Sequence, residues 1–124
     1  MRKIEFRGKR IDNNEWTYGS LVVLENIDGE KIFSILKSDG TGQHVIEETI
    51  GEYTGLKDKN GKEIFEGDVM SISPISPKYE IKWDNEQQRF CFWNDGWIAG
   101  FNGFITGYEV IGNIYDNPGL CGAG

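Results

Sequence analysis

The sequence predicts a mainly β protein with little helix, built as a small barrel or as paired sheets. Short apolar or alternating segments recur along the chain, and turn-forming glycine, asparagine or aspartate residues separate them. Most of the 17 glycines lie at such turn positions. No segment keeps a helical spacing of apolar residues beyond about two turns. These observations favour short antiparallel strands joined by tight turns.

Four segments of the N-terminal half have the composition of strands, and the last of them could equally form one helical turn. Trp16 and Tyr18 are predicted to share one face of the second segment, because side chains alternate along a strand. Gly19, in the same segment, marks a bulge or a close approach of two backbones. The four segments cover residues 1–8, 16–24, 31–36 and 44–50.

The stretch over residues 53–70 combines a hairpin with the start of a buried strand. Asp58 and Gly61 bound a tight turn, because Asp accepts hydrogen bonds from nearby amides and Gly adopts positive φ without strain. Asp68 is predicted to cap free amides at a second corner. A calcium loop would need an oxygen ligand where Lys62 stands, so we expect no metal site here.

Four further strands are predicted in the C-terminal half, after a break at residues 73–77, where two prolines lack amide donors. Beyond them, residues 119–124 are expected to form a flexible tail. The predicted strands cover residues 78–83, 89–93, 97–99 and 108–115.

Aromatic residues gather between positions 83 and 104. A small core cannot bury them all, so we expect about two thirds in the core and the rest on a contact surface. The cluster contains Trp83, Phe90, Phe92, Trp93, Trp97, Phe101 and Phe104. The candidate interaction surface consists of Trp83, Trp93, Trp97, Phe101 and Phe104.

The composition excludes several classes of protein. Thirteen basic and twenty acidic residues give a net charge of −7, which disfavours nonspecific nucleic-acid binding. No apolar run could span a membrane and no signal peptide is evident, so we expect a cytoplasmic protein. Cys91 and Cys121 are expected to be free thiols.

Few residues offer catalytic chemistry. His44 has no cysteine or histidine at a metal-binding spacing and lies beside a flexible loop. Cys91 lies between two phenylalanines, where burial would raise its pKa. Glu47 and Glu48 are adjacent, so on a strand they would point to opposite faces. We therefore predict no catalytic, cofactor-binding or metal-binding residue, and we predict that the protein is not an enzyme.

Three blocks resemble the YopX family of phage and prophage proteins: residues 7–19, 54–69 and 109–118. The middle block, TGLKDKNGKEIFEGDV, is the most specific. The resemblance implies a small β-rich protein encoded by a phage or prophage. It implies no activity, cofactor or catalytic residue.

The preferred interpretation is a single domain over residues 1–118, resembling a small SH3-like barrel with an additional N-terminal β segment. Its expected role is that of a non-enzymatic phage accessory protein, which contacts a host or phage protein and could form homo-oligomers through its aromatic strands. One alternative is an acidic DNA mimic, or an inhibitor of a host nucleic-acid-binding protein. A nucleic-acid binder would need a basic patch, and a small hydrolase would need His44 beside a nucleophile in a pocket. The basic patch would consist of Arg2, Lys3, Arg7, Lys9 and Arg10.

Overall fold

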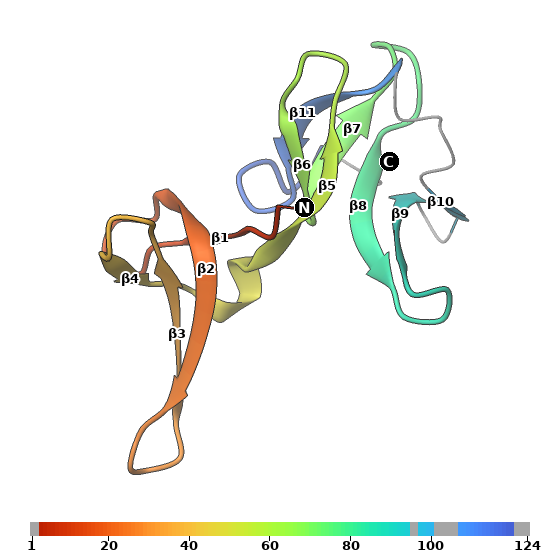
Figure 1. Ribbon diagram of the computed structural model, residues 1–124. Coiled ribbons are helices and arrows are strands. Elements are labelled where there is room, and N and C mark those ends of the chain that lie inside the picture. Colours follow the sequence, from red (N-terminus) through yellow and green to blue (C-terminus); the bar gives the residue numbers. More distant parts are fainter. Residues whose placement is uncertain (1–2, 95–96, 101–106, 121–124) are drawn as a thin grey trace. The chain divides into compact units, whose positions relative to one another are not determined.

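The computed structural model describes residues 3–94, 97–100 and 107–120, with backbone alone for residues 97–100. Strands make up 53% of this part of the chain and helix 4%, which confirms the mainly β prediction. The strands form two antiparallel sheets, which are both open within the described residues (Figure 1). The described strands therefore do not form a closed barrel, and the SH3-like detail of the prediction is not confirmed. Strand segments can be read from local patterns, but whether the last strand pairs with the first depends on contacts distant in sequence.

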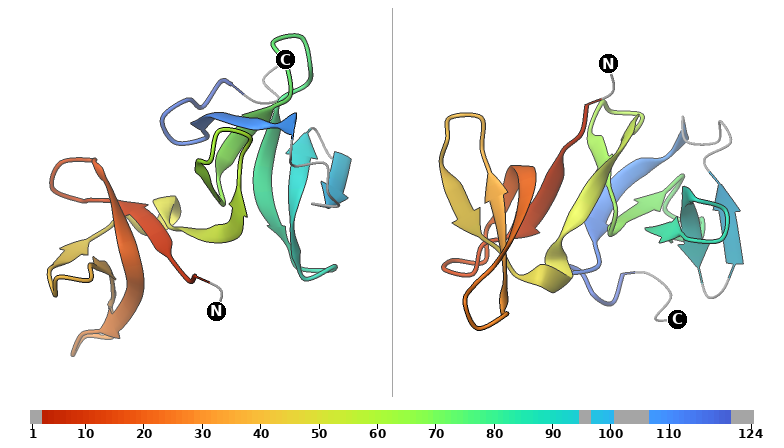
Figure 2. Two further views of the ribbon diagram at one scale, coloured as in Figure 1. Left: turned by 45° about the horizontal axis from the view of Figure 1, so that its top comes forward. Right: turned by 60° about the horizontal axis from the view of Figure 1, so that its bottom comes forward.

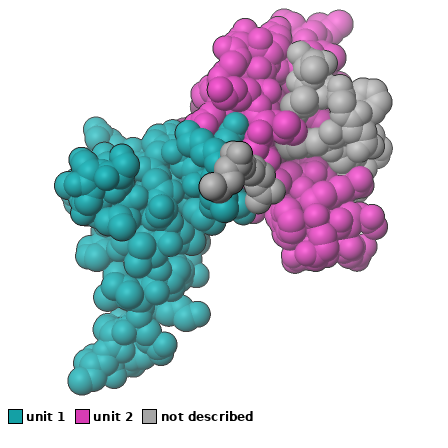
Figure 3. Space-filling model, in the orientation of Figure 1, with its two compact units in different colours: residues 1–53 teal, residues 54–124 magenta. Residues whose placement is uncertain are grey.

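The chain divides into two compact units, residues 1–53 and residues 54–124 (Figure 3). Compact units of this kind can belong to one domain, so the single domain predicted over residues 1–118 stays a prediction. Part of the predicted tail, residues 121–124, lies outside the described residues. Leu120 still donates its amide hydrogen to the carbonyl of Asn117 at 3.0 Å.

Unit 1 contains one sheet with the strand order β4-β3-β2-β1-β5. Lys9 pairs with Trp16 and Arg7 with Tyr18, so both aromatic side chains lie on one face, as predicted. A Cβ atom at Gly19 would lie 2.2 Å from the carbonyl oxygen of Leu36, which confirms the predicted close approach of two backbones. The elements are β1 (Phe6–Lys9), β2 (Trp16–Glu25), β3 (Lys31–Leu36), β4 (Gly42–His44), the 3₁₀ turn η1 (Glu47–Thr49) and β5 (Gly51–Lys57).

The β2–β3 hairpin extends past its neighbouring strands (Figures 1 and 2). β1 pairs with residues 16–19 of β2, and β4 pairs with residues 34–36 of β3. Beyond these points the hairpin is a two-stranded ribbon. Isolated ribbons of this kind are marginally stable, because few side chains pack on them.

Unit 2 holds the main hydrophobic core. Ile64, Met70, Ile81 and Phe92 are fully or almost fully buried in it. β5 continues into this unit and is bonded to β6, and the second sheet has the order β10-β9-β8-β7-β11. Its strands are β6 (Glu63–Phe65), β7 (Asp68–Ser71), β8 (Tyr79–Asp84), β9 (Arg89–Asn94), β10 (Trp97–Gly100) and β11 (Glu109–Asn113).

Two buried aspartates hold the corners of unit 2. Asp68 is 1% exposed and accepts the amide hydrogen of Phe65 at 2.8 Å. Asp58 closes the predicted tight turn, where Gly61 has φ of 83°, and it also accepts the amide hydrogen of Val110 at 2.9 Å. Both aspartates therefore cap backbone amides, as predicted. The hydrogen bond from Val110 to Asp58 also joins two positions that are distant in sequence.

Candidate functional site

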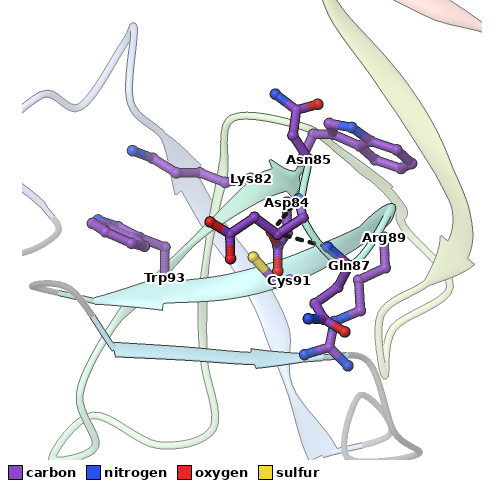
Figure 4. Close-up of a pocket in the computed structure, with 9 residues that line it drawn as sticks. Lys82, Asp84, Asn85, Gln87, Arg89, Cys91 and Trp93 are labelled. Carbon is purple, nitrogen blue, oxygen red and sulfur yellow. Dashed lines mark hydrogen bonds between the residues drawn. The ribbon is translucent and has the colours of Figure 1, made fainter.

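A shallow depression of about 400 Å³ lies over β8 and β9 (Figure 4). Lys82 pairs with Cys91 and Asp84 with Arg89, so these four side chains lie on the face opposite the core, because paired residues of antiparallel strands share a face. Trp93 belongs to the same face. The full lining comprises Lys82, Trp83, Asp84, Asn85, Glu86, Gln87, Arg89, Cys91 and Trp93.

The depression is held by contacts between its own residues. The Nζ atom of Lys82 lies 4.6 Å from the ring centroid of Trp93, a cation–π contact that fixes both side chains. Oδ1 of Asp84 accepts the amide hydrogens of Glu86 at 3.0 Å and of Gln87 at 3.4 Å. The lining of the depression thus combines tryptophan side chains with charges of both signs, a composition suited to a protein interface.

Two titratable groups of this face, Cys91 and Glu80, have raised pKa values. Burial raises the pKa of the Cys91 thiol, and the charge of Asp84 raises it further, so the thiol is the dominant form at neutral pH. Burial also raises the pKa of Glu80, although Lys82 partly offsets this. The prediction that Cys91 is a small buried residue is confirmed by its exposure of 1%.

The residues of the predicted interaction surface do not all lie together. Trp93 belongs to the face with the depression, whereas Trp83 pairs with Phe90 on the core face. Trp83 is nevertheless 40% exposed, with its ring centroid 5.0 Å from that of Phe90. Trp97 pairs through its backbone with Asn94. The side chain of Trp97 and the whole of Phe101 and Phe104 lie outside the described residues.

Sequence reasoning missed the charged part of this site. It singled out the aromatic residues alone, although the alternation of Glu80, Lys82 and Asp84 with apolar residues indicated a solvated face. That pattern could have located Lys82 and Asp84. It could not have located Arg89 opposite Asp84, because the register of β8 and β9 depends on the turn between them.

His44 lies beside a hydroxyl group. Its Nδ1 atom is 2.9 Å from Oγ of Ser34, and the two residues are paired on β4 and β3. The side chain is exposed on a short strand at the edge of the sheet, and it does not line the depression on β8 and β9. The pair meets the proximity condition for a hydrolase, but that interpretation also required a pocket, and Ser34 does not line the depression on β8 and β9 either.

The basic residues near the N-terminus are engaged within unit 1. The guanidinium of Arg7 lies 4.5 Å from the ring centroid of Trp16, and Nζ of Lys9 lies 5.5 Å from the same centroid. Arg10 forms two hydrogen bonds with the carboxylate of Asp12, at 2.9 and 2.7 Å. Arg7 is only 4% exposed. Arg7, Lys9 and Arg10 of the predicted basic patch thus contact side chains of their own unit, whereas Arg2 lies outside the described residues.

Two further features are absent from the described part of the chain. Those residues include no group of three or more metal-ligating side chains. They also include no helix of the length and hydropathy needed to cross a membrane.

Comparison with known proteins gives a family and a fold. A family model described as YopX protein matches residues 5–121. Protein EF1440 from Enterococcus faecalis has 29% sequence identity to this chain. Its crystal structure superposes on this one with a TM-score of 0.60, and the match covers 97% of this chain and 99% of the other. Protein yopX from Bacillus subtilis is 19% identical, with a TM-score of 0.54 and coverage of 97% and 98%. No curated protein matches the chain.

Proposed function

The chain belongs to the YopX protein family, and from this membership and the surfaces described above we propose that it is a non-enzymatic binding protein encoded by a phage or prophage. It acts in the cytoplasm of the bacterial host by contacting another protein, of host or phage origin. The depression on β8 and β9 forms part of the contact surface, together with the exposed Trp83.

The observation that carries this proposal is the composition of the depression. Trp93 and Lys82 are packed against each other, and Arg89 extends from an exposed position on its rim. Tryptophan and arginine supply much of the energy of protein interfaces, because they combine a large apolar area with hydrogen-bond donors. A surface prepared in this way needs little rearrangement to bind.

The chemistry of the described residues supports binding rather than catalysis. Asp58 and Asp68 are buried and cap turns, and the Cys91 thiol has a raised pKa. Ser34 and His44 lie together in an exposed position, and neither residue lines the depression on β8 and β9. A catalytic acid or base must lie within reach of a substrate proton, whereas the carboxylates of Asp58 and Asp68 are bonded to backbone amides.

The test is capture of proteins from host lysate on the tagged full-length chain. We expect at least one protein above background, and we expect the charge reversal Arg89→Glu to reduce its capture by about tenfold, as for an interface residue contributing about 1.4 kcal/mol. Lys57→Glu changes the net charge equally, at an exposed position of β5 outside the depression, and should leave capture unchanged.

Two results would contradict the proposal. One is retention of a nucleic acid or a small molecule with no protein above background. The other is an equal loss of capture in both charge-reversal variants, because a general charge effect would then explain the binding.

A further inference from the structure

Among the described residues, no strand pairs with the outer edge of β2 beyond Gly19. Residues 20–25, the β2 edge segment, lie beyond the end of β1, which pairs with β2 only up to Gly19. An edge strand of this kind is a template for pairing with another chain unless charges, proline or a bulge protect it. The segment reads SLVVLE, so Glu25 is its single charge, and its register with β3 is unbroken.

The pairing pattern shows which residues of the segment face outward. The amide of Asn26 donates to the carbonyl of Glu30 at 2.8 Å, and bonded pairs alternate with non-bonded pairs along an antiparallel ribbon. The bonding of Phe33 fits this alternation. Its carbonyl accepts a hydrogen bond from the amide of Val45 in the neighbouring segment, rather than from its β2 partner Val23. The residues whose backbone groups point away from β3 are Leu21, Val23 and Glu25.

We propose that the β2 edge segment pairs antiparallel with the same segment of a second copy of this chain, about a two-fold axis at Val23. The product is a continuous four-stranded sheet with the order β3-β2-β2-β3. This interface does not depend on the proposed function, since it uses another part of the chain than β8 and β9.

The register follows from the outward residues. Pairing Val23 with Val23 of the second copy places Leu21 opposite Glu25, and all three positions then exchange backbone hydrogen bonds. No like charges face each other in this register. An axis at Val22 would instead require Gly19 to pair with Glu25 of the second copy, and Gly19 is already paired with Phe6 of β1.

Side chains of the hairpin favour a second copy as the occupant. Val23 and Leu24 are 45% and 60% exposed, and Ile27 at the tip is fully exposed. In the proposed register the tip reaches the level of Gly19 in the other copy. A depression of about 370 Å³ opens there, with a lining of mixed composition: Ile4, Glu5, Tyr18, Gly19, Ser20, Leu36, Lys37 and Ser38. The tip thus brings the exposed Ile27 and the acidic Asp28 to a hollow whose lining includes Leu36 and Lys37. The same contact occurs twice, as a closed two-fold interface requires.

The first test is the mass of the full-length chain in solution as a function of concentration. We expect a species of twice 14.1 kDa, and Val23→Lys should weaken its formation by at least about tenfold, because two like charges then face each other on the axis. Val23→Glu should do the same. An equimolar mixture of the two variants should recover the dimer, because opposite charges then meet.

The control is Ile75→Lys, at a loop position that is 95% exposed, which should leave the dimer intact. Circular dichroism establishes that each variant is folded. A chain that stays monomeric at every concentration, a dimer that survives Val23→Lys, or a mixture of the two variants that does not associate would each overturn the proposal.

Amide hydrogen exchange gives a second readout on the unmodified protein. The amides of Leu21, Val23 and Glu25 should exchange rapidly at low concentration and become protected as the dimer forms. The amides of Val22 and Leu24 bond within the ribbon, so they should depend far less on concentration. Rapid exchange at Val23 in a sample that is wholly dimeric would overturn the proposed register.

Discussion

Asp58 provides the sharpest test of how unit 2 is held together. Its Oδ1 atom accepts the amide hydrogens of Asn60 at 2.8 Å and Lys62 at 2.9 Å, and its Oδ2 atom accepts that of Val110 at 2.9 Å. The residue is 7% exposed. In the variant Asp58→Asn, a side-chain N–H group faces one of these amide hydrogens, so one bond becomes a repulsion and the other two lose their charge.

The expected cost follows from the bonds lost. A hydrogen bond to a charged group contributes about 1.5–3 kcal/mol, and leaving a buried donor unsatisfied adds to the loss. We therefore expect Asp58→Asn to lower the free energy of unfolding by about 2–4 kcal/mol. For a chain of this size that lowers the Tm by about 10 °C.

The measurement is thermal unfolding at pH 7, followed by tryptophan fluorescence. Asp39→Asn is a matched control, because Asp39 also accepts a backbone amide hydrogen, from Thr41 at 2.9 Å, but in an exposed loop. That variant should leave the Tm unchanged. Equal Tm values for the wild type and Asp58→Asn would refute the reasoning.

The same carboxylate gives a pH dependence with a definite sign. Burial raises the pKa of Asp58, but hydrogen bonds from the amides of Val110, Lys62 and Asn60 outweigh it, so the pKa is lowered overall. The unfolded chain therefore binds this proton more readily. The contribution of Asp58 to stability is complete above about pH 5 and is lost as the pH falls below about 4 through the folded-state pKa. The difference in Tm between wild type and Asp58→Asn should accordingly shrink in acid, and a constant difference between pH 7 and pH 2 would show that the charge is not its source.

Two further predictions concern close packing. Gly19→Ala should lower the free energy of unfolding by about 1–3 kcal/mol, because its Cβ would overlap the carbonyl oxygen of Leu36. Gly42→Ala should lower it far less, because its Cβ would meet the side chain of Leu36 at an ordinary 3.6 Å. Denaturant titration measures both losses of stability, and equal losses would contradict the close approach at Gly19. The variant Cys121→Ser leaves Cys91 as the one thiol of the chain. Cys91 should then react with a thiol reagent at least about tenfold more slowly in the native state than in guanidinium, because it is buried and its pKa is raised. Equal reaction rates in the two states would contradict that burial.

Local structure was largely predictable from the sequence. β3 has the predicted bounds, residues 31–36, because a short apolar run between two turn clusters leaves little choice. Asp58 and Asp68 cap amides as predicted, since the same few residues on each side determine each turn.

The arrangement of the strands was not predictable in the same way. β1 lies between β2 and β5, and its pairing with β5 joins Phe6 to Glu52, across most of unit 1. Local patterns contain no information about such a pairing. The choice between a small barrel and paired sheets stayed open for this reason. The charged face of β8 and β9 was missed because its pairs arise only once the register is set.

The bond between Asp58 and Val110 has a consequence for synthesis on the ribosome. The two residues are separated by 52 positions, and β11, which carries Val110, pairs with β7. The second unit therefore lacks an edge strand until its last segment has left the exit tunnel, and contacts so remote in sequence form slowly. The strands of the first unit are all complete by residue 57, so a nascent chain can order that half while the other half still waits for its closing strand.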